Sequence, residues 1–340
     1  MFIAGKLFVG GVKNIVQFDE ELNVTRRKFF GKTFDHPKCY PSPVDCLETS
    51  SYVDNIVSVL LTNQVDQYVL ACFTSQQGLC SVLPYSDITN PKSFADVTDT
   101  ATYLGSSASS YAFFGSPPSG QLDNPKRLVY AAMATYDRSD TKFSPKTIST
   151  REVMSNATNW QMRYFYDNAA VNEHSYLNVF PSIQSRFRVK YIYGFELNGY
   201  GYFVSIQPTD SDVSRTEYVT RLVQFCLNDK QYKTYIETAI KCVDTNGINY
   251  TYATAAFIQK DENENTLSIS FVKPAKTGSL DYDVQYGTRI CNFSMKTVRD
   301  HFVSLREKCH SGVDGFYPWW IQGSIQKCRQ QTGTPVGGLA

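Results

Sequence analysis

Histidine limits the chemistry available to this chain, because only His36, His174, His301 and His310 are present. A cysteine can act as a nucleophile when a histidine serves as its base, and Cys309 directly precedes His310. Neighbours in sequence form no dyad unless the fold brings their side chains together, so a structural role is favoured for both. The zinc-enzyme histidine pattern, the Gly-x-Ser-x-Gly elbow and the P-loop are absent. We therefore predict no catalytic residue, no metal site and no cofactor.

Carboxylates offer a second route to chemistry. Asp210 and Asp212 could suggest calcium, but the central glycine and terminal glutamate of an EF-hand loop are missing, and a solvated turn explains them better. A glycosidase would need two carboxylates that face each other across a pocket. Nothing among the 32 acidic residues marks such a pair. A secreted propeller enzyme such as a glycosidase stays the alternative to a binding function, although no residue pair in the sequence favours it.

Nine cysteines are present, and none are spaced as Cys-x-x-Cys. The spacing of Cys39 from Cys46, and of Cys72 from Cys80, suits small disulfide-closed loops better than zinc ligation. We therefore predict disulfides within these two pairs. Four Asn-x-Ser/Thr sequons point to the same secretory compartment, because each is an acceptor for a glycan there. The candidate glycosylation sites are Asn23, Asn156, Asn249 and Asn292.

The chain shows no targeting or anchoring signal. Its first residues lack a basic start, and Lys6 interrupts their apolar stretch, which argues against a signal peptide. No apolar run approaches the roughly 18 residues of a membrane-spanning helix. An extracellular composition without these segments leads us to expect a fragment, with the signal, the membrane span and any cytoplasmic part outside this chain.

Short strands must position these features. Aromatic residues make up 14% of the chain, which favours pleated structure. Many short strands separated by turns indicate a sandwich, barrel or propeller, and a length of 340 residues favours the propeller. The net charge of +1 without a basic stripe argues against nucleic-acid binding. The apolar runs that we expect to be strands are Leu7–Val9, Ile15–Phe18, Ile56–Leu61, Tyr68–Phe73, Leu79–Leu83, Leu128–Ala134, Tyr191–Leu197, Tyr202–Gln207, Tyr218–Cys226, Tyr250–Ile258 and Leu267–Val272.

One helix is predicted over residues 294–308, as an insertion in the β framework. Ser294 is a suitable N-cap, and Met295, Val298, Phe302 and Leu305 recur at helical spacing.

Two further aromatic features have structural explanations. Asn198-Gly199 is a hairpin turn that pairs the tyrosine-rich strands on either side. Trp319 and Trp320 could form an interaction hot spot, but packing of a loop onto the propeller is favoured because tryptophan is usually well buried.

Several stretches, in order along the chain, resemble the plexin family. LFVGGVKNIVQFDEELNV is similar to the opening of sema domains, and GKTFDHPKCYPSPVDC resembles a plexin loop with a Cys-Tyr-Pro core. CFTSQQGLC, YFVSIQPTDSD and TRLVQFCLNDKQYKTYIETAIKC also have plexin counterparts, as do Cys291 and the helix after it. The Pro-Lys-Cys-Tyr-Pro loop separates the chain from semaphorins.

The resemblance implies an all-β, seven-bladed sema propeller. Residues 1–340 would be a partial sema domain that lacks the final blades, and an unclosed ring would make the isolated chain prone to aggregate. The implied function is that of the extracellular ligand-binding domain of a plexin-like semaphorin receptor, in cell-surface signalling and guidance. The implied partners are a semaphorin-type protein and a second receptor copy, not a nucleic acid or a small-molecule substrate, on the extracellular side of the cell membrane.

The resemblance also extends the disulfide scheme. It implies the pairs Cys242–Cys291 and Cys309–Cys328, which leaves Cys226 unpaired. In plexins the cysteine at that place pairs with one that lies shortly beyond the counterpart of Cys328. Either that partner was lost by divergence, or it lies past Ala340 in a longer protein, which is the alternative that we favour.

Overall fold

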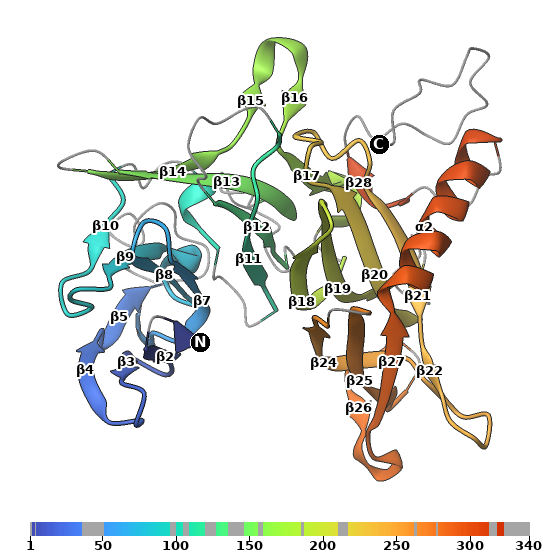
Figure 1. Ribbon diagram of the computed structural model, residues 1–340, viewed down its shortest axis with the longest axis horizontal. Helices are drawn as coiled ribbons and strands as arrows, with labels where there is room; N and C mark the ends of the chain where they lie inside the picture. The colour runs from blue at the N-terminus through green and yellow to red at the C-terminus, as the bar shows by residue number, and fades with distance from the viewer. Residues whose placement is uncertain are drawn as a thin grey trace.

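The computed structural model describes residues 2–3, 5–35, 51–95, 100–104, 109–119, 127–134, 146–155, 159–184, 187–209, 217–261, 264–276, 278–312 and 318–322. These residues are mainly β-strand. Five sheets of four or more strands follow one another along the chain and lie side by side in an arc, as the blades of a propeller do (Figure 1).

The first two blades are antiparallel meanders joined by a two-stranded ribbon. Blade 1 contains β1 (Phe2–Ile3), β2 (Lys6–Gly10), β3 (Asn14–Phe18) and β4 (Val24–Phe29). The ribbon pairs β5 (Lys32–Asp35) with β6 (Ser51–Asp54). Blade 2 contains β7 (Val57–Asn63), β8 (Tyr68–Phe73), β9 (Cys80–Pro84) and β10 (Lys92–Ser93).

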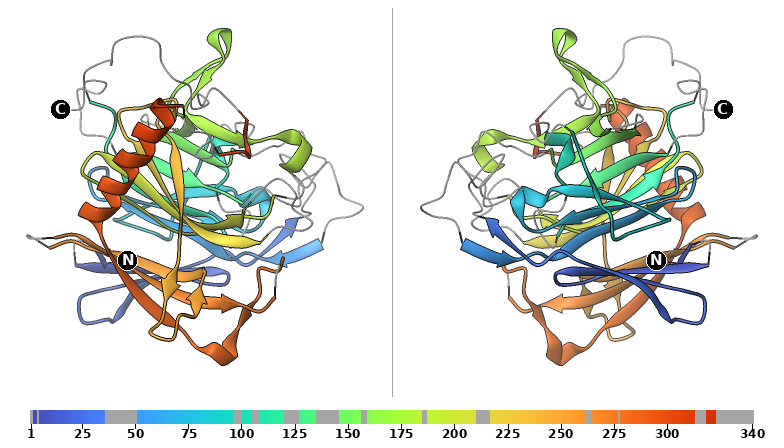
Figure 2. Two further views of the ribbon diagram at one scale, coloured as in Figure 1. Left: turned by 90° about the vertical axis from the view of Figure 1, so that its right-hand side faces the viewer. Right: turned by 90° about the vertical axis from the view of Figure 1, so that its left-hand side faces the viewer.

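The third blade is the largest. It contains β11 (Tyr111–Gly115), β12 (Leu128–Ala132), β13 (Ile148–Ser155), β14 (Trp160–Tyr164), β17 (Tyr176–Val179) and β28 (Ile321–Gln322). The hairpin of β15 (Asp167–Asn168) and β16 (Glu173–His174) projects from it (Figures 1 and 2).

The last two blades are again antiparallel. Blade 4 contains β18 (Lys190–Leu197), β19 (Tyr200–Pro208), β20 (Tyr218–Cys226) and β21 (Ile236–Ile240). Blade 5 contains β24 (Tyr252–Gln259), β25 (Thr266–Pro274), β26 (Tyr282–Asp283) and β27 (Arg289–Ser294). A ribbon of β22 (Cys242–Val243) and β23 (Asn249–Tyr250) lies between them in sequence. The helices of the described residues are η2 (Gln76–Gly78), η3 (Thr100–Thr102), η4 (Ala169–Val171), η5 (Val284–Tyr286), α1 (Pro181–Gln184) and α2 (Met295–His310).

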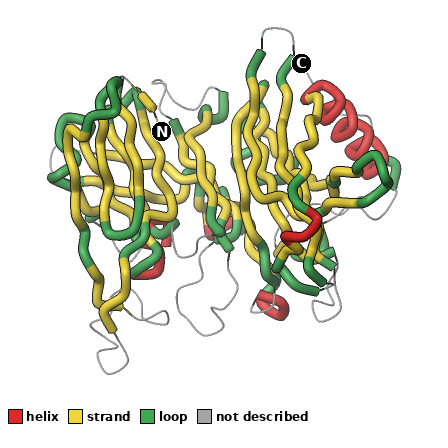
Figure 3. Tube along the Cα trace, turned by 90° about the horizontal axis from the view of Figure 1, so that it is seen from below, coloured by secondary structure: helices red, strands yellow, loops and turns green. Residues whose placement is uncertain are grey.

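The first full strand of each blade contacts the first strand of the next. The contacts run from β2 to β7, β11, β18 and β24 in turn. The described residues of β24 and β2 make no comparable contact, so the ring stays open between blades 5 and 1. The all-β, incomplete propeller predicted from the sequence is confirmed, and Figure 3 shows its strands stacked in successive layers, with α2 along one edge.

Hydrophobic layers between neighbouring blades form the core. Strand β12 shows why: its alternate residues Leu128 and Tyr130 pack toward blade 4, whereas Val129 and Ala131 pack toward blade 2. A strand between two layers is apolar on both faces, unlike a strand with one solvated face. Such strands account for the continuous apolar runs that the sequence shows.

The predicted hairpin and helix are both present. Asn198 and Gly199 join β18 to β19 with φ values of 51° and 79°, the left-handed conformation that a two-residue Asn-Gly turn supplies. Helix α2 begins after Ser294, whose hydroxyl accepts a hydrogen bond from the backbone N–H of Thr297 at 3.4 Å. Its buried residues Met295, Phe302 and Leu305 pack onto the layer between blades 4 and 5.

The tryptophan pair packs as the sequence predicts. Trp320 is fully buried and stacks on Phe187, with ring centroids 5.0 Å apart. Its indole N–H lies 3.3 Å from both carboxylate oxygens of Glu237. Gln207 Nε2 and the Tyr235 hydroxyl also donate to Glu237, at 2.8 and 3.0 Å. The segment after α2 is thereby fixed against blade 4.

Candidate ligand-binding surface

The residues considered for catalysis do not come together in the described part of the chain. Cys309 is disulfide-bonded, so its sulfur is not a free nucleophile. His174 Nδ1 lies 2.5 Å from Asp167 Oδ1, and its Nε2 lies 3.1 Å from Asn172 Oδ1. His301 Nε2 lies 3.1 Å from the Thr238 hydroxyl.

A metal site would need several ligand side chains close together. No three His, Cys, Asp or Glu side chains in the described ranges gather in a way that could hold a metal ion. His36, Asp210 and Asp212 lie outside those ranges.

The disulfide between Cys72 and Cys80 closes the end of the β8–β9 hairpin. The two cysteines are opposite each other in the antiparallel register, with Cα atoms 3.9 Å apart. The loop between them turns through Gln77 and Gly78, whose φ values are 62° and 91°. The carbonyl of Gly78 then accepts a hydrogen bond from the N–H of Leu104 at 2.9 Å, which brings the next connecting segment onto this loop.

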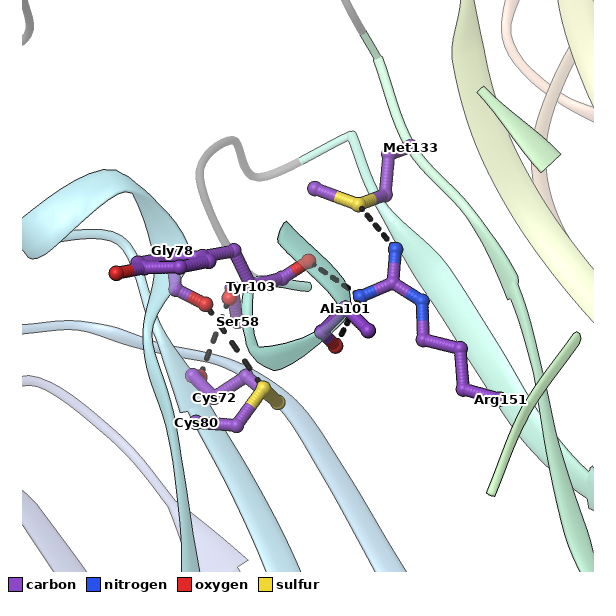
Figure 4. The surroundings of a disulfide bond; sticks show 8 residues. All are labelled: Ser58, Cys72, Gly78, Cys80, Ala101, Tyr103, Met133 and Arg151. Carbon is purple, nitrogen blue, oxygen red and sulfur yellow. Dashed lines mark hydrogen bonds between the residues drawn. A yellow bond between two sulfur atoms is a disulfide. The ribbon is translucent and has the colours of Figure 1, made fainter. Parts of the chain in front are cut away.

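Arg151 holds that connecting segment from the other side. Its side chain is fully buried on β13. Nη1 donates to the carbonyls of Ala101 and Tyr103, at 2.5 and 2.7 Å (Figure 4). Nε donates to the Ser149 hydroxyl at 2.9 Å. The disulfide loop of blade 2 and the buried guanidinium of blade 3 therefore fix one connection between them.

A second disulfide joins Cys242 on β22 to Cys291 on β27, with Cα atoms 5.8 Å apart. It attaches the β22–β23 ribbon to blade 5 beside the layer that also receives α2. Both disulfides are pairs that the sequence analysis predicts. Cys39, Cys46 and Cys328 lie outside the described residues, so the pairs Cys39–Cys46 and Cys309–Cys328 stay predictions.

Among the described residues Cys226 is bonded to no other cysteine, and its side chain is half-buried. It is opposite Tyr200 in the register of β20 and β19. Arg306 of α2 lies over the Tyr200 ring, 5.8 Å from its centroid, and burial lowers the pKa of that guanidinium. The cysteine therefore lies where α2 meets blade 4.

Three of the four sequons lie in the described residues, and all three asparagines are exposed. Asn23 lies before β4, and Asn249 lies on the β22–β23 ribbon. Asn292 lies on β27, where its Oδ1 accepts a hydrogen bond from the Ser268 hydroxyl at 2.8 Å. Asn156 lies outside the described residues.

The opening of the ring lies between blade 1 and blade 5, and both blades expose apolar side chains. On blade 1, Phe8 is buried against blade 2, whereas Val9 of the opposite face is 45% exposed. On the outer face of blade 5, Phe257 and Ile290 are exposed beside the Asn292 sequon. Both blades at the opening of the ring therefore expose apolar side chains.

Sequence reasoning missed the two buried charged residues that anchor this scaffold, Arg151 and Glu237. Charged residues are rarely buried unless they are paired, and their partners lie far away in sequence. No local pattern in the sequence marks either residue. No helix in the described ranges is long and apolar enough to cross a membrane.

Comparisons with known proteins agree with this architecture. No protein-family model matches the chain. Mouse plexin-A4 is 24% identical over 338 residues, which cover 94% of this chain and 17% of the relative. Mouse plexin-A2 is 22% identical over 358 residues, which cover 98% of this chain and 18% of that relative. The chain thus spans less than a fifth of the length of these relatives.

Solved structures show the same fold. The full extracellular region of plexin A4 superposes with a TM-score of 0.81 at 22% identity, covering 97% of this chain and 37% of that one. Drosophila plexin A in complex with semaphorin 1b gives a TM-score of 0.52 at 12% identity, covering 88% of this chain and 52% of that one. Along nearly its whole length, the chain is therefore similar to plexins in sequence and has the fold of the plexin sema propeller.

Proposed function

We propose that residues 1–340 are a partial sema domain that lacks the final blades, from the extracellular ligand-binding part of a semaphorin receptor of the plexin type. The main support for this proposal is the similarity to plexins along nearly the whole chain, in sequence and in fold. One of the structural relatives is a plexin in complex with a semaphorin. The receptor lies in the cell membrane, with this domain outside the cell, and it signals and guides cells in response to its ligand.

The chemistry of the surface supports a protein ligand. Exposed apolar side chains are spread over the blades, and disulfides fix their connections. A stable protein–protein interface buries about 1,200–2,000 Å², and a rigid propeller presents that area without reorganisation. We propose that the domain itself performs no catalysis. A glycosidase is not favoured, because the homologues found along the chain are plexins.

Binding to semaphorins tests this function. The purified chain is immobilised and a panel of semaphorin ectodomains from the same organism is passed over it, with an unrelated propeller as the control surface. Saturable binding of at least one semaphorin supports the proposal. The proposal is overturned if the folded chain binds none of the panel and the protein encoded by any longer transcript binds none of it either.

A further inference from the structure

The third blade carries a surface pocket that the proposed function does not use. Its volume is about 610 Å³, and its lining includes Asp167, the first residue of the β15–β16 hairpin. Figure 1 shows that hairpin projecting from the third blade. Its wall comes from η3, β14, the turn after β14, β15, β17 and the residue two positions before β13. The lining residues are Thr100, Lys146, Arg163, Tyr164, Phe165, Tyr166, Asp167 and Tyr176.

Lys146 gives the pocket a cation that is not in a salt bridge with any described residue. Its Nζ lies over the ring of Tyr176, 4.4 Å from the centroid. Among the described residues it forms no ion pair within 4 Å. Burial lowers the pKa of Lys146, and the nearby Asp167 opposes that change. An anionic group beside the ammonium would favour its charged form.

The carboxylates near the pocket are already occupied. Asp167 lies 2.5 Å from His174 Nδ1. Glu152 is paired with the second cation of the wall, Arg163, at 3.2 Å. Arg163 is largely exposed, with 59% of its side-chain surface open, so further donors of its guanidinium face solvent. The pocket thus offers an anion more positive than negative partners.

Hydroxyls and rings make up the rest of the wall. The hydroxyls of Thr100 and Tyr164 lie 2.9 Å apart and hydrogen-bond to each other, and a threonine hydroxyl can serve as donor and acceptor at once. The rings of Tyr164 and Tyr176 are tilted against each other, with centroids 4.9 Å apart. Aromatic edges beside hydroxyl groups suit a ligand that is itself part apolar and part hydroxylated.

We propose that this pocket binds an acidic sugar, a saccharide unit that carries a sulfate or a carboxylate. A volume of about 610 Å³ lies in the range of small-ligand pockets, and it exceeds what one inorganic anion would fill. The anionic group lies at Lys146 and the sugar hydroxyls meet Thr100 and Tyr164. The inference does not rest on the semaphorin-receptor function.

Isothermal titration of the full chain tests the site. The probes are a heparin-derived tetrasaccharide, its desulfated form, which keeps the carboxylates, and sialyllactose, with lactose and inorganic sulfate as controls. The native chain should bind at least one acidic probe and neither control. Loss of binding on desulfation assigns the sulfate, whereas retained binding or binding of sialyllactose assigns the carboxylate.

Two lysine variants locate the site. Lys146→Ala should weaken binding roughly tenfold, since a hydrogen bond to a charged group is lost. Lys273→Ala is the matched control, because that lysine lies 3.7 Å from the centroid of Tyr286 on blade 5, in the same kind of contact. It should leave binding unchanged.

Arg163→Ala provides a second variant if Lys146→Ala melts early, since the Arg163 side chain is mostly exposed. It too should weaken binding. The proposal is overturned if the native chain binds none of the acidic probes, if it binds inorganic sulfate as tightly as the sugars, or if folded Lys146→Ala and Arg163→Ala bind like the native chain.

Discussion

Replacement of Trp320 by phenylalanine should destabilise the fold far more than the same change at Trp319. The side chain of Trp320 is fully buried, and its N–H lies 3.3 Å from both oxygens of Glu237. Trp319 is partly buried in the same layer, but its N–H has no acceptor among the described residues. Phenylalanine keeps a ring at both positions and removes the N–H from both.

The expected magnitudes follow from that difference. Both changes lose a similar part of the indole surface, at a cost of about 1 kcal/mol. Trp320→Phe also removes a hydrogen bond to a buried charged group, which adds about 1.5–3 kcal/mol. Trp319→Phe removes an unsatisfied donor, so its additional cost is near zero or favourable. The free energies of unfolding should therefore differ by about 2 kcal/mol between the variants.

Urea denaturation followed by circular dichroism measures both variants without relying on tryptophan fluorescence. Glu237→Gln, alone and combined with Trp320→Phe, completes a double-mutant cycle. A coupling energy of about 1 kcal/mol or more is expected between these two positions. Equal midpoint shifts for Trp319→Phe and Trp320→Phe, with no coupling to Glu237, would refute the role of the buried hydrogen bond.

Four other changes have outcomes that the structure predicts. Arg151→Met should cost about 3 kcal/mol or more in urea unfolding, because two carbonyls lose their buried donor; a cost below about 1 kcal/mol would contradict this. Replacing Cys242 and Cys291 together with alanine should cost on the order of 4 kcal/mol, because the sequence separation is 49 residues, and non-reducing peptide mapping of the native chain must first recover that pair. Asn292→Gln should lower the mass of the secreted chain by one glycan, since this asparagine is exposed, and enzymatic deglycosylation of both proteins should abolish the difference. An equal mass of the untreated proteins would show the sequon to be unused. Burial, helped by nearby Tyr193, raises the pKa of Tyr111 to about 12 from its ordinary 10.0. The contribution of the neutral phenol to stability is therefore complete below pH 10 and is lost as the pH rises toward 12. Over that pH range, a tyrosinate absorbance titration should show less alkaline unfolding for Tyr111→Phe than for the native chain.

The strands with two buried faces could be recognised from the sequence. Residues 128–132 are apolar throughout because they lie between two hydrophobic layers. Helix α2 was also predictable, since its cap and its apolar spacing are local features. The Asn198-Gly199 turn was predictable for the same reason, because the required positive φ values belong to the two residues themselves.

Other elements had no local signal. Strand β13 (Ile148–Ser155) is polar in sequence, yet Ser149, Thr150, Arg151 and Glu152 are buried in it. A buried polar strand is stable only when distant groups supply its hydrogen bonds. Those partners come from other parts of the chain, as the carbonyls of Ala101 and Tyr103 do for Arg151.

The sequence by itself determined the class of fold, the hydrophobic strands, the inserted helix and, through its motifs, the resemblance to plexins. Only the tertiary structure decided where the charged residues lie, that Glu237 receives Trp320, and that Lys146 faces a pocket of aromatic residues. The reason is physical. Apolar periodicity and turn chemistry act over a few neighbouring residues, whereas a buried charge is stabilised by groups tens of residues away that only the folded chain brings together.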